Sequence, residues 1–242
     1  MSNLLTDENL SRKEEESFTS AKLQRRSFLQ FAGAGAAGIA LVAAGCKKDK
    51  NTGPGMNSGV DLGSGDVGIL NYAYALEQLE AAFYLYVAAN PYSGISDLEK
   101  MYLNDIRDHE VAHREFFKNA IPADKRIPNL EVNFSSIDFT KRDSVLGTAK
   151  AFEDLGVAAY NGAGFLIKSA DYLLLAGKIV SVEARHAALI RDLISNGSFA
   201  SSGNGEPLDA NAIDKPLLPA QVLPIAGTYI KTKINASNLP TS

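Results

Sequence analysis

Apolar residues recur with the period of an α-helix over four segments of this chain. The first segment spans about 66–89, the second about 97–119, the third begins near 143 and the fourth ends near 194. None of these segments has the alternating pattern of a β-strand, so we predict four helices. Their apolar faces include Ile69, Ala73, Leu76, Phe83 and Val87, then Leu98, Tyr102, Ile106 and Phe117, then Val145, Phe152, Leu155, Ala159 and Ala163, and finally Leu175, Ile179, Val182, Leu189 and Leu193.

The connections between these helices differ in length. The stretch 90–94, NPYSG, predicts a turn between the first two helices, and the break between the last two lies around 168–171. Residues 121–142 contain two prolines and show no helical period, so they form a long connection. We therefore predict an all-α fold, an antiparallel four-helix bundle over residues 66–195 made of two hairpins joined by one crossover.

Residues 1–45 are typical of an export signal and not of the bundle. Arg25 and Arg26 stand before a glycine- and alanine-rich apolar run, 31–44, an arrangement that resembles a twin-arginine signal. The run falls short of the roughly 20 apolar residues that cross a bilayer, which disfavours a permanent transmembrane helix.

The apolar run ends in LVAAGC, which resembles a bacterial lipoprotein cleavage box. The resemblance implies that Cys46 is lipidated and anchors the mature chain to the membrane, so we expect an exported, periplasmic lipoprotein. An ordinary signal peptide that leaves Cys46 as a free thiol is the alternative. Residues 46–65 are polar and glycine-rich, which predicts a flexible tether, and residues 196–242 predict an irregular tail with a short helix around 221–230.

Composition excludes several classes of function. Cys46 is the single cysteine, so the chain has no intramolecular disulfide framework, no cysteine-ligated zinc or iron–sulfur site and no thiol nucleophile in the bundle. The formal net charge is −4 and no basic stripe is present, which argues against nucleic acid as a partner.

Two of the three histidines follow a glutamate by three positions, in Glu110-Val111-Ala112-His113 and in Glu183-Ala184-Arg185-His186. Residues three apart share one face of a helix, and here that face is the apolar one. Buried ionisable groups are costly unless they are paired or bound to a metal. Two such pairs directed into one core therefore predict a cation site.

The first pair also lies within H-E-x-x-H, because His109 precedes Glu110. On a helix this motif is typical of a zinc metallohydrolase, in which His109 and His113 bind the metal and Glu110 activates water. That hypothesis requires a third ligand and leaves the second pair, at Glu183 and His186, without a role.

The other two helices form an internal repeat. The stretch ALEQLEAAFY, which contains Glu77 and Tyr84, aligns with AFEDLGVAAY, which contains Glu153 and Tyr160. Each glutamate lies about as far before its predicted turn as the E-x-x-H pair lies after it. In an antiparallel hairpin, each glutamate therefore lies at the same height along the bundle as the E-x-x-H pair on the neighbouring helix.

With these motifs, residues 66–195 resemble the ferritin-like di-iron or di-manganese carboxylate proteins, which include bacterioferritin, rubrerythrin and manganese catalase. Within that group the chain is most similar to exported and desiccation-related ferritin-like proteins. The resemblance implies a pair of iron or manganese ions, bridged by Glu110 and Glu183, and a tyrosine beside the site, so that Tyr84 and Tyr160 become candidates for a catalytic role. The implied ligands are Glu77, Glu110, His113, Glu153, Glu183 and His186.

Some assignments stay open on sequence alone. Glu80 lies nearer the centre of the apolar face than Glu77 does and is a second candidate ligand, although the repeat pairs it with Gly156. The alternative interpretation of Glu153 is a solvent-exposed glutamate outside the site. The alternative interpretation of Tyr84 and Tyr160 is that they are core residues that only pack.

The implied function is oxidation of ferrous iron or reduction of peroxide, with dioxygen or hydrogen peroxide as the small-molecule substrate, in stress protection. A bundle of the same fold that binds little metal and serves as a stress or interaction module is the alternative. The sequence does not indicate an oligomeric state.

Overall fold

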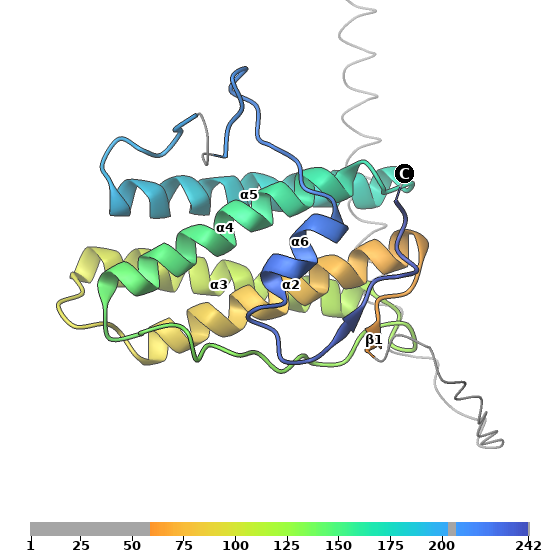
Figure 1. The fold of residues 1–242 in the computed structure, drawn as a ribbon, viewed down its shortest axis with the longest axis horizontal. Helices are drawn as coiled ribbons and strands as arrows, with labels where there is room; N and C mark the ends of the chain where they lie inside the picture. The colour runs from red at the N-terminus through yellow and green to blue at the C-terminus, as the bar shows by residue number, and fades with distance from the viewer. Residues whose placement is uncertain (1–58, 203–206, 242) are drawn as a thin grey trace, which may run out of the picture. The chain divides into compact units, whose positions relative to one another are not determined.

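A computed structural model describes residues 59–202 and 207–241 of the chain. The regular structure of the described residues consists of five helices and two strands of two residues each, which confirms the predicted all-α bundle (Figure 1). The predicted export signal, with its twin arginines, and Cys46 lie outside the described residues. The elements are β1 (Val60–Asp61), α2 (Gly65–Ala89), α3 (Asp97–Ala120), α4 (Arg142–Gly164), α5 (Ala170–Ile194), α6 (Pro219–Ala226) and β2 (Ile234–Asn235).

The four long helices form two hairpins. Helix α2 packs mainly against α3, and α4 packs mainly against α5. The long connection from α3 to α4 runs past the end of the bundle and along one side of it, as Figure 1 shows. This is the predicted connectivity, and it turns one face of each of the four helices toward a common core.

Local capping residues explain where the helices begin. The side chain of Ser96 accepts a hydrogen bond from the backbone N–H of Glu99, whose carboxylate accepts one in return from the N–H of Ser96, so α3 starts with a capping box. Ser64, and not the acidic Asp66 in the first turn, holds the N-cap position of α2. The carboxylate of Asp66 instead accepts hydrogen bonds from the N–H groups of Lys168 and Ser169 in the turn before α5.

Two predicted apolar faces are displaced in the structure. Leu98, placed on the inner face of the second helix, is 52% exposed because it lies in the first turn of α3, beyond the packed part of the bundle. On α5 the buried stripe contains Ile179, Glu183, His186 and Ile190. Of the apolar positions predicted for this helix only Ile179 belongs to the stripe, and Leu175, Val182, Leu189 and Leu193 are half-buried.

The segments flanking the bundle are more ordered than the sequence indicated. β1 lies within the predicted tether and pairs in parallel with β2, and Leu62 beside it is fully buried. The predicted tail contributes β2 and also α6, where Val222 and Ala226 are fully buried against the bundle. Strands of two residues leave no periodic signal, which is why the sequence did not predict them.

In the parts of the chain that the structure describes, no helix has the length and apolar character needed to cross a membrane.

Candidate metal centre

Six ionisable side chains from four helices meet in the centre of the bundle. The four glutamates among them are at most 1% exposed, although carboxylates are rarely buried without a partner. The structure thus brings together all six residues that the resemblance implied as ligands, while their role in binding metal remains a prediction. They are Glu77 on α2, Glu110 and His113 on α3, Glu153 on α4, and Glu183 and His186 on α5.

The six residues form two overlapping groups of potential metal ligands. One group consists of Glu77, Glu110, His113 and Glu183, and the other of Glu110, Glu153, Glu183 and His186; in each, the ligand atoms lie within 4.8 Å of one another. Both groups contain Glu110 and Glu183. These two carboxylates are therefore placed to bridge two ions, while each remaining glutamate and histidine belongs to one group alone.

Distances around the two histidines show how the two shared carboxylates are oriented. The Nδ1 atom of His113 lies 2.8 Å from Oε1 of Glu183 and 3.8 Å from Oε2 of Glu110. The Nδ1 atom of His186 lies 3.2 Å from Oε2 of Glu183 and 2.9 Å from Oε1 of Glu110. Each of these two shared carboxylates thus directs one oxygen toward each histidine.

Two tyrosines hold the remaining glutamates by hydrogen bonds that cross the bundle. Tyr84 of α2 donates its hydroxyl proton to Oε1 of Glu153 on α4 at 2.5 Å, and Tyr160 of α4 donates to Oε1 of Glu77 on α2. Each tyrosine occupies one carboxylate oxygen. The other oxygen, Oε2, lies 3.6 Å from Nδ1 of His113 for Glu77 and 3.5 Å from Nδ1 of His186 for Glu153.

His109 lies outside both groups of candidate ligands. Its Nδ1 atom is 2.8 Å from Nε2 of His186, and the planes of the two rings are nearly parallel, at 10° to each other. A mononuclear zinc site would need His109 and His113 as joint ligands, so this geometry argues against the metallohydrolase hypothesis. The sequence offered no signal for the contact, because it joins two helices 77 positions apart.

Glu80 is a fifth carboxyl group near the centre. It is 4% exposed, but it belongs to neither ligand group, and its Oε2 atom has no hydrogen-bond partner. A Cβ atom on Gly156 would lie 3.0 Å from Oε1 of Glu80, so the glycine makes room for this carboxylate. The structure therefore favours Glu77 over Glu80 as the ligand from α2, in agreement with the internal repeat.

The electrostatics of the cluster follow from its burial. Burial raises the pKa of Glu77, Glu110 and Glu153, and the nearby charge of Glu183 adds to that effect. Burial alone would also raise the pKa of Glu183, but its contacts with His113 and His186 outweigh it and lower that pKa.

Both histidines are pulled toward their charged form. Burial opposes a charge on either ring, yet the surrounding carboxylates raise the pKa of His113 and of His186 to about 12. Without a metal, protons on the imidazoles partly balance the carboxylates. A cation that binds through Nδ1 must therefore displace those protons.

The family comparison agrees with this geometry. A family model described as a ferritin-like domain matches residues 65–196. The chain belongs to the ferritin-like family. The matched region of this ferritin-like protein begins with α2 and ends just after α5, so it contains all six clustered residues. A comparison with curated proteins found no matching relative.

Proposed function

We propose that this ferritin-like protein binds two iron or manganese ions and uses them to reduce hydrogen peroxide or dioxygen, as an exported protein of stress protection. The observation that carries the proposal is the sharing of Glu110 and Glu183 between two groups of potential ligands. A single-ion site has no need for a second set of terminal ligands.

The residues present fit a pair of divalent cations. Three buried oxygens in the cluster have no hydrogen-bond partner, because the nearest histidine Nδ1 atoms lie 3.5–3.8 Å away; they are the Oε2 atoms of Glu77, Glu110 and Glu153. Buried polar atoms are normally paired, so unpaired ones in one place indicate an absent partner. Four carboxylates carry four formal negative charges, which two divalent ions balance. Imidazole and carboxylate donors suit iron and manganese better than thiophilic metals.

The chemistry that a bound pair supplies is a transfer of two electrons, which with two protons converts one hydrogen peroxide into two water molecules or one dioxygen into one hydrogen peroxide. The chain contributes position and electrostatics. Glu110 and Glu183 would hold both ions, while the hydrogen bonds from Tyr84 and Tyr160 orient the carboxylates of Glu153 and Glu77 so that their Oε2 atoms face the centre. The apolar core around them limits the access of water.

Export is a separate part of the proposal and rests on the sequence alone. The twin arginines at Arg25 and Arg26 and the box that ends at Cys46 support a lipid-anchored protein on the periplasmic side of the membrane. A twin-arginine route, as known from its other substrates, carries folded proteins and would allow the metal to be loaded before export. Labelling of the expressed protein with a fatty-acid analogue, compared with the Cys46→Ser variant, tests the anchor.

The redox part is tested by loading the protein anaerobically with ferrous iron and mixing it with peroxide or dioxygen in a stopped-flow spectrophotometer. The proposal expects rapid oxidation of two iron ions per chain by at least one of the two oxidants, and slow, solution-like oxidation in the His113→Ala, His186→Ala double variant. Equal rates in both proteins would contradict it. Manganese loading, followed by peroxide consumption, serves as the parallel assay.

A further inference from the structure

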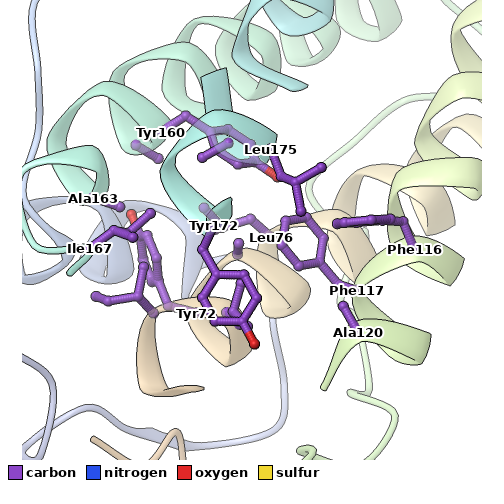
Figure 2. Close-up of a pocket in the computed structure, with 15 residues that line it drawn as sticks. Tyr72, Leu76, Phe116, Phe117, Ala120, Tyr160, Ala163, Ile167, Tyr172 and Leu175 are labelled. Carbon is purple, nitrogen blue, oxygen red and sulfur yellow. The ribbon is translucent and has the colours of Figure 1, made fainter. Parts of the chain in front are cut away.

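The first turns of α5 carry apolar side chains on two sides. On the inner side, Tyr172 and Leu175 line an apolar pocket between α2, α3, α4 and α5, as Figure 2 shows. On the outer side, Leu173 is 46% exposed and Leu174 is 60% exposed. A helix that is apolar on all sides is normally buried on all sides, so the outer leucines indicate a partner that the bundle itself does not supply.

Phe165, at the turn between α4 and α5, extends this outer apolar surface. It is the C-cap residue of α4 and is 76% exposed, more than any other large apolar side chain that the structure describes. A Cβ atom on Gly164 would lie 3.7 Å from Cδ1 of Leu173, so this leucine packs against the residue before Phe165. Phe165, Leu173 and Leu174 therefore form one surface, which we call the turn patch. Exposed patches of apolar side chains mark contacts with proteins or membranes.

The turn patch lies at the end of the bundle where the described chain begins. The carboxylate of Asp66, in the first turn of α2, accepts hydrogen bonds from the N–H groups of Lys168 and Ser169 in the same turn as the patch. Gly59 and β1 precede α2, and Figure 1 shows β1 and the start of α5 at the same end of the bundle. The segment that leads from Cys46 therefore joins the bundle at the end that carries the patch.

The length of the segment before the bundle limits which surface can reach a membrane. Gly59 follows Cys46 by 13 positions. For a glycine-rich sequence of that length, random-chain dimensions predict an average span of about 20 Å. Helix α2 has 25 residues, and at 1.5 Å per residue it is about 37 Å long. Anchored through Cys46, the chain thus keeps the patch end of the bundle close to the bilayer, whereas the opposite end lies beyond this average span.

The charges beside the patch suit an anionic membrane surface. Lys168 lies in the turn, and Lys178 follows Leu174 by about one turn of α5. Both lysines are exposed and face one exposed acid in this stretch, Asp171, although the whole chain has a net charge of −4. Lysine stems can lie along an apolar surface while their ammonium groups reach the lipid phosphates. Apolar side chains combined with lysines in this way bind membrane interfaces.

The size of the patch suits a lipid surface better than a second protein chain. Each side of a stable protein interface contributes roughly 20–30 residues. The turn patch has three, with charged residues beside them. A lipid-anchored chain needs far less, because its tether makes the contact intramolecular, with an effective concentration on the order of millimolar.

We propose that the turn patch binds the membrane surface, with Phe165, Leu173 and Leu174 in the interface and the two lysines against anionic phospholipid headgroups. In the cell this contact rests on the proposed lipid anchor at Cys46, and it gives the anchored bundle one orientation. The turn between α4 and α5 faces the bilayer, and the turn between α2 and α3 faces away from it.

The chain contains no tryptophan, so one introduced tryptophan is a unique fluorescent reporter. Phe165→Trp places it in the patch. Leu98→Trp places it at the opposite end of the bundle, where Leu98 is 52% exposed. The mature chain, residues 46–242, is coupled through Cys46 to a maleimide lipid in vesicles of phosphatidylcholine and phosphatidylglycerol. This coupling supplies the anchor, so the result does not depend on whether the cell lipidates Cys46.

Vesicles with brominated acyl chains quench a tryptophan that enters the bilayer interface. They should lower the emission of the Phe165→Trp variant about twofold or more relative to unbrominated vesicles, and leave that of Leu98→Trp unchanged. No quenching in Phe165→Trp, or equal quenching in both variants, would overturn the proposal. An emission shift of Phe165→Trp with protein concentration, measured without vesicles, would overturn it in favour of a second copy of the chain.

The two leucines of the patch are tested in the Phe165→Trp background. Leu173→Ser together with Leu174→Ser should abolish the quenching, and Leu174→Ser alone replaces this pair if the double variant does not fold. Leu85→Ser together with Met101→Ser is the matched control, because these residues are 42% and 49% exposed near the other end of the bundle. The control should keep the quenching. Full quenching in a folded leucine variant would show that the patch does not bind lipid.

The anchor and the surface fail in different ways. If fatty-acid labelling detects no lipid on Cys46, the proposed anchor is wrong, and quenching in the coupled chain still decides whether the patch binds a membrane. Vesicles of phosphatidylcholine alone should quench Phe165→Trp less than half as strongly as vesicles that contain phosphatidylglycerol. Equal quenching in both would overturn the role of Lys168 and Lys178.

Discussion

The Nδ1 atom of His109 lies 2.8 Å from the Nε2 atom of His186, and the two rings are nearly parallel. Because Nδ1 of His186 faces the carboxylates, a metal bound there leaves the proton of this imidazole on Nε2. Nε2 then donates to His109, whose Nδ1 accepts. His109 is thus a positioning residue that fixes the ring orientation and the tautomer of His186.

Removing His109 should weaken metal binding on one side of the centre. Outer hydrogen bonds to ligating histidines contribute about 10- to 100-fold in metal affinity, so His109→Ala should lower the affinity for one of the two ions by that order. Titration calorimetry with manganese measures it. His109→Gln, which keeps a side-chain acceptor, should recover part of the affinity. An unchanged affinity in His109→Ala would show that the contact does not orient His186.

Replacing either cross-bundle tyrosine should destabilise the protein. Tyr84→Phe leaves Oε1 of Glu153 without its donor, and Tyr160→Phe does the same to Glu77. Hydrogen bonds to charged groups contribute about 1.5–3 kcal/mol, so the free energy of unfolding should fall by that amount in denaturant titrations. Tyr72→Phe is the control, since its hydroxyl has no partner and its loss should not destabilise. A similar loss in all three variants would contradict the assignment.

Glu80 should make the metal-free protein less stable as pH rises. Burial, and then the charges of Glu110 and Glu77, raise the pKa of Glu80 well above its usual value. A carboxyl with a raised pKa binds its proton more tightly in the folded state, so its stabilising contribution is complete below the unfolded pKa and is lost as pH rises toward the folded pKa. In thermal unfolding scans from pH 5 to 8, Glu80→Gln should therefore lose less stability than the unmodified chain.

The same substitution separates Glu80 from Glu77. Glu80→Gln should retain both metal ions, because Glu80 is outside both ligand groups, whereas Glu77→Gln should lose affinity for one ion. Identical pH slopes in Glu80→Gln and the unmodified chain would show that the carboxyl has another neutralising partner.

The contact between α4 and the C-terminal segment should depend on one glycine. A Cβ atom on Gly162 would lie 2.0 Å from the carbonyl oxygen of Leu217, whose N–H donates to the carbonyl of Ala158 at 2.9 Å. Gly162→Ala should therefore cost about 1–3 kcal/mol of stability or more. Gly147→Ala, exposed on the same helix with nothing within 4 Å, should instead stabilise by about 0.5–1 kcal/mol. Equal melting temperatures for the two variants would contradict the packing.

The sequence predicts the site where it depends on periodicity within one helix. Glu110 with His113 and Glu183 with His186 are each three residues apart, and the internal repeat adds Glu77. Contacts between helices leave no such signal. The bond between His109 and His186, the space that Gly156 gives to Glu80, and the apolar pocket all arise from how the helices are rotated against one another, and this rotation is fixed only by packing.

The ends of the fold were less predictable for a different reason. β1 and β2 are too short to show alternation, and Gly162 is a place of close backbone approach that resembles any other helical glycine in the sequence.

Elemental analysis of the purified mature domain tests the central claim most directly, together with the His113→Ala, His186→Ala double variant and the His109→Ala single variant. The account predicts two iron or manganese ions per chain in the unmodified domain, their loss in the double variant, and at least one ion retained in His109→Ala. One zinc ion per chain that is lost in His109→Ala but kept in a His186→Ala variant would contradict it in favour of a metallohydrolase. A chain that takes up no metal even after incubation with ferrous iron or manganese would contradict it in favour of a bundle without a metal centre.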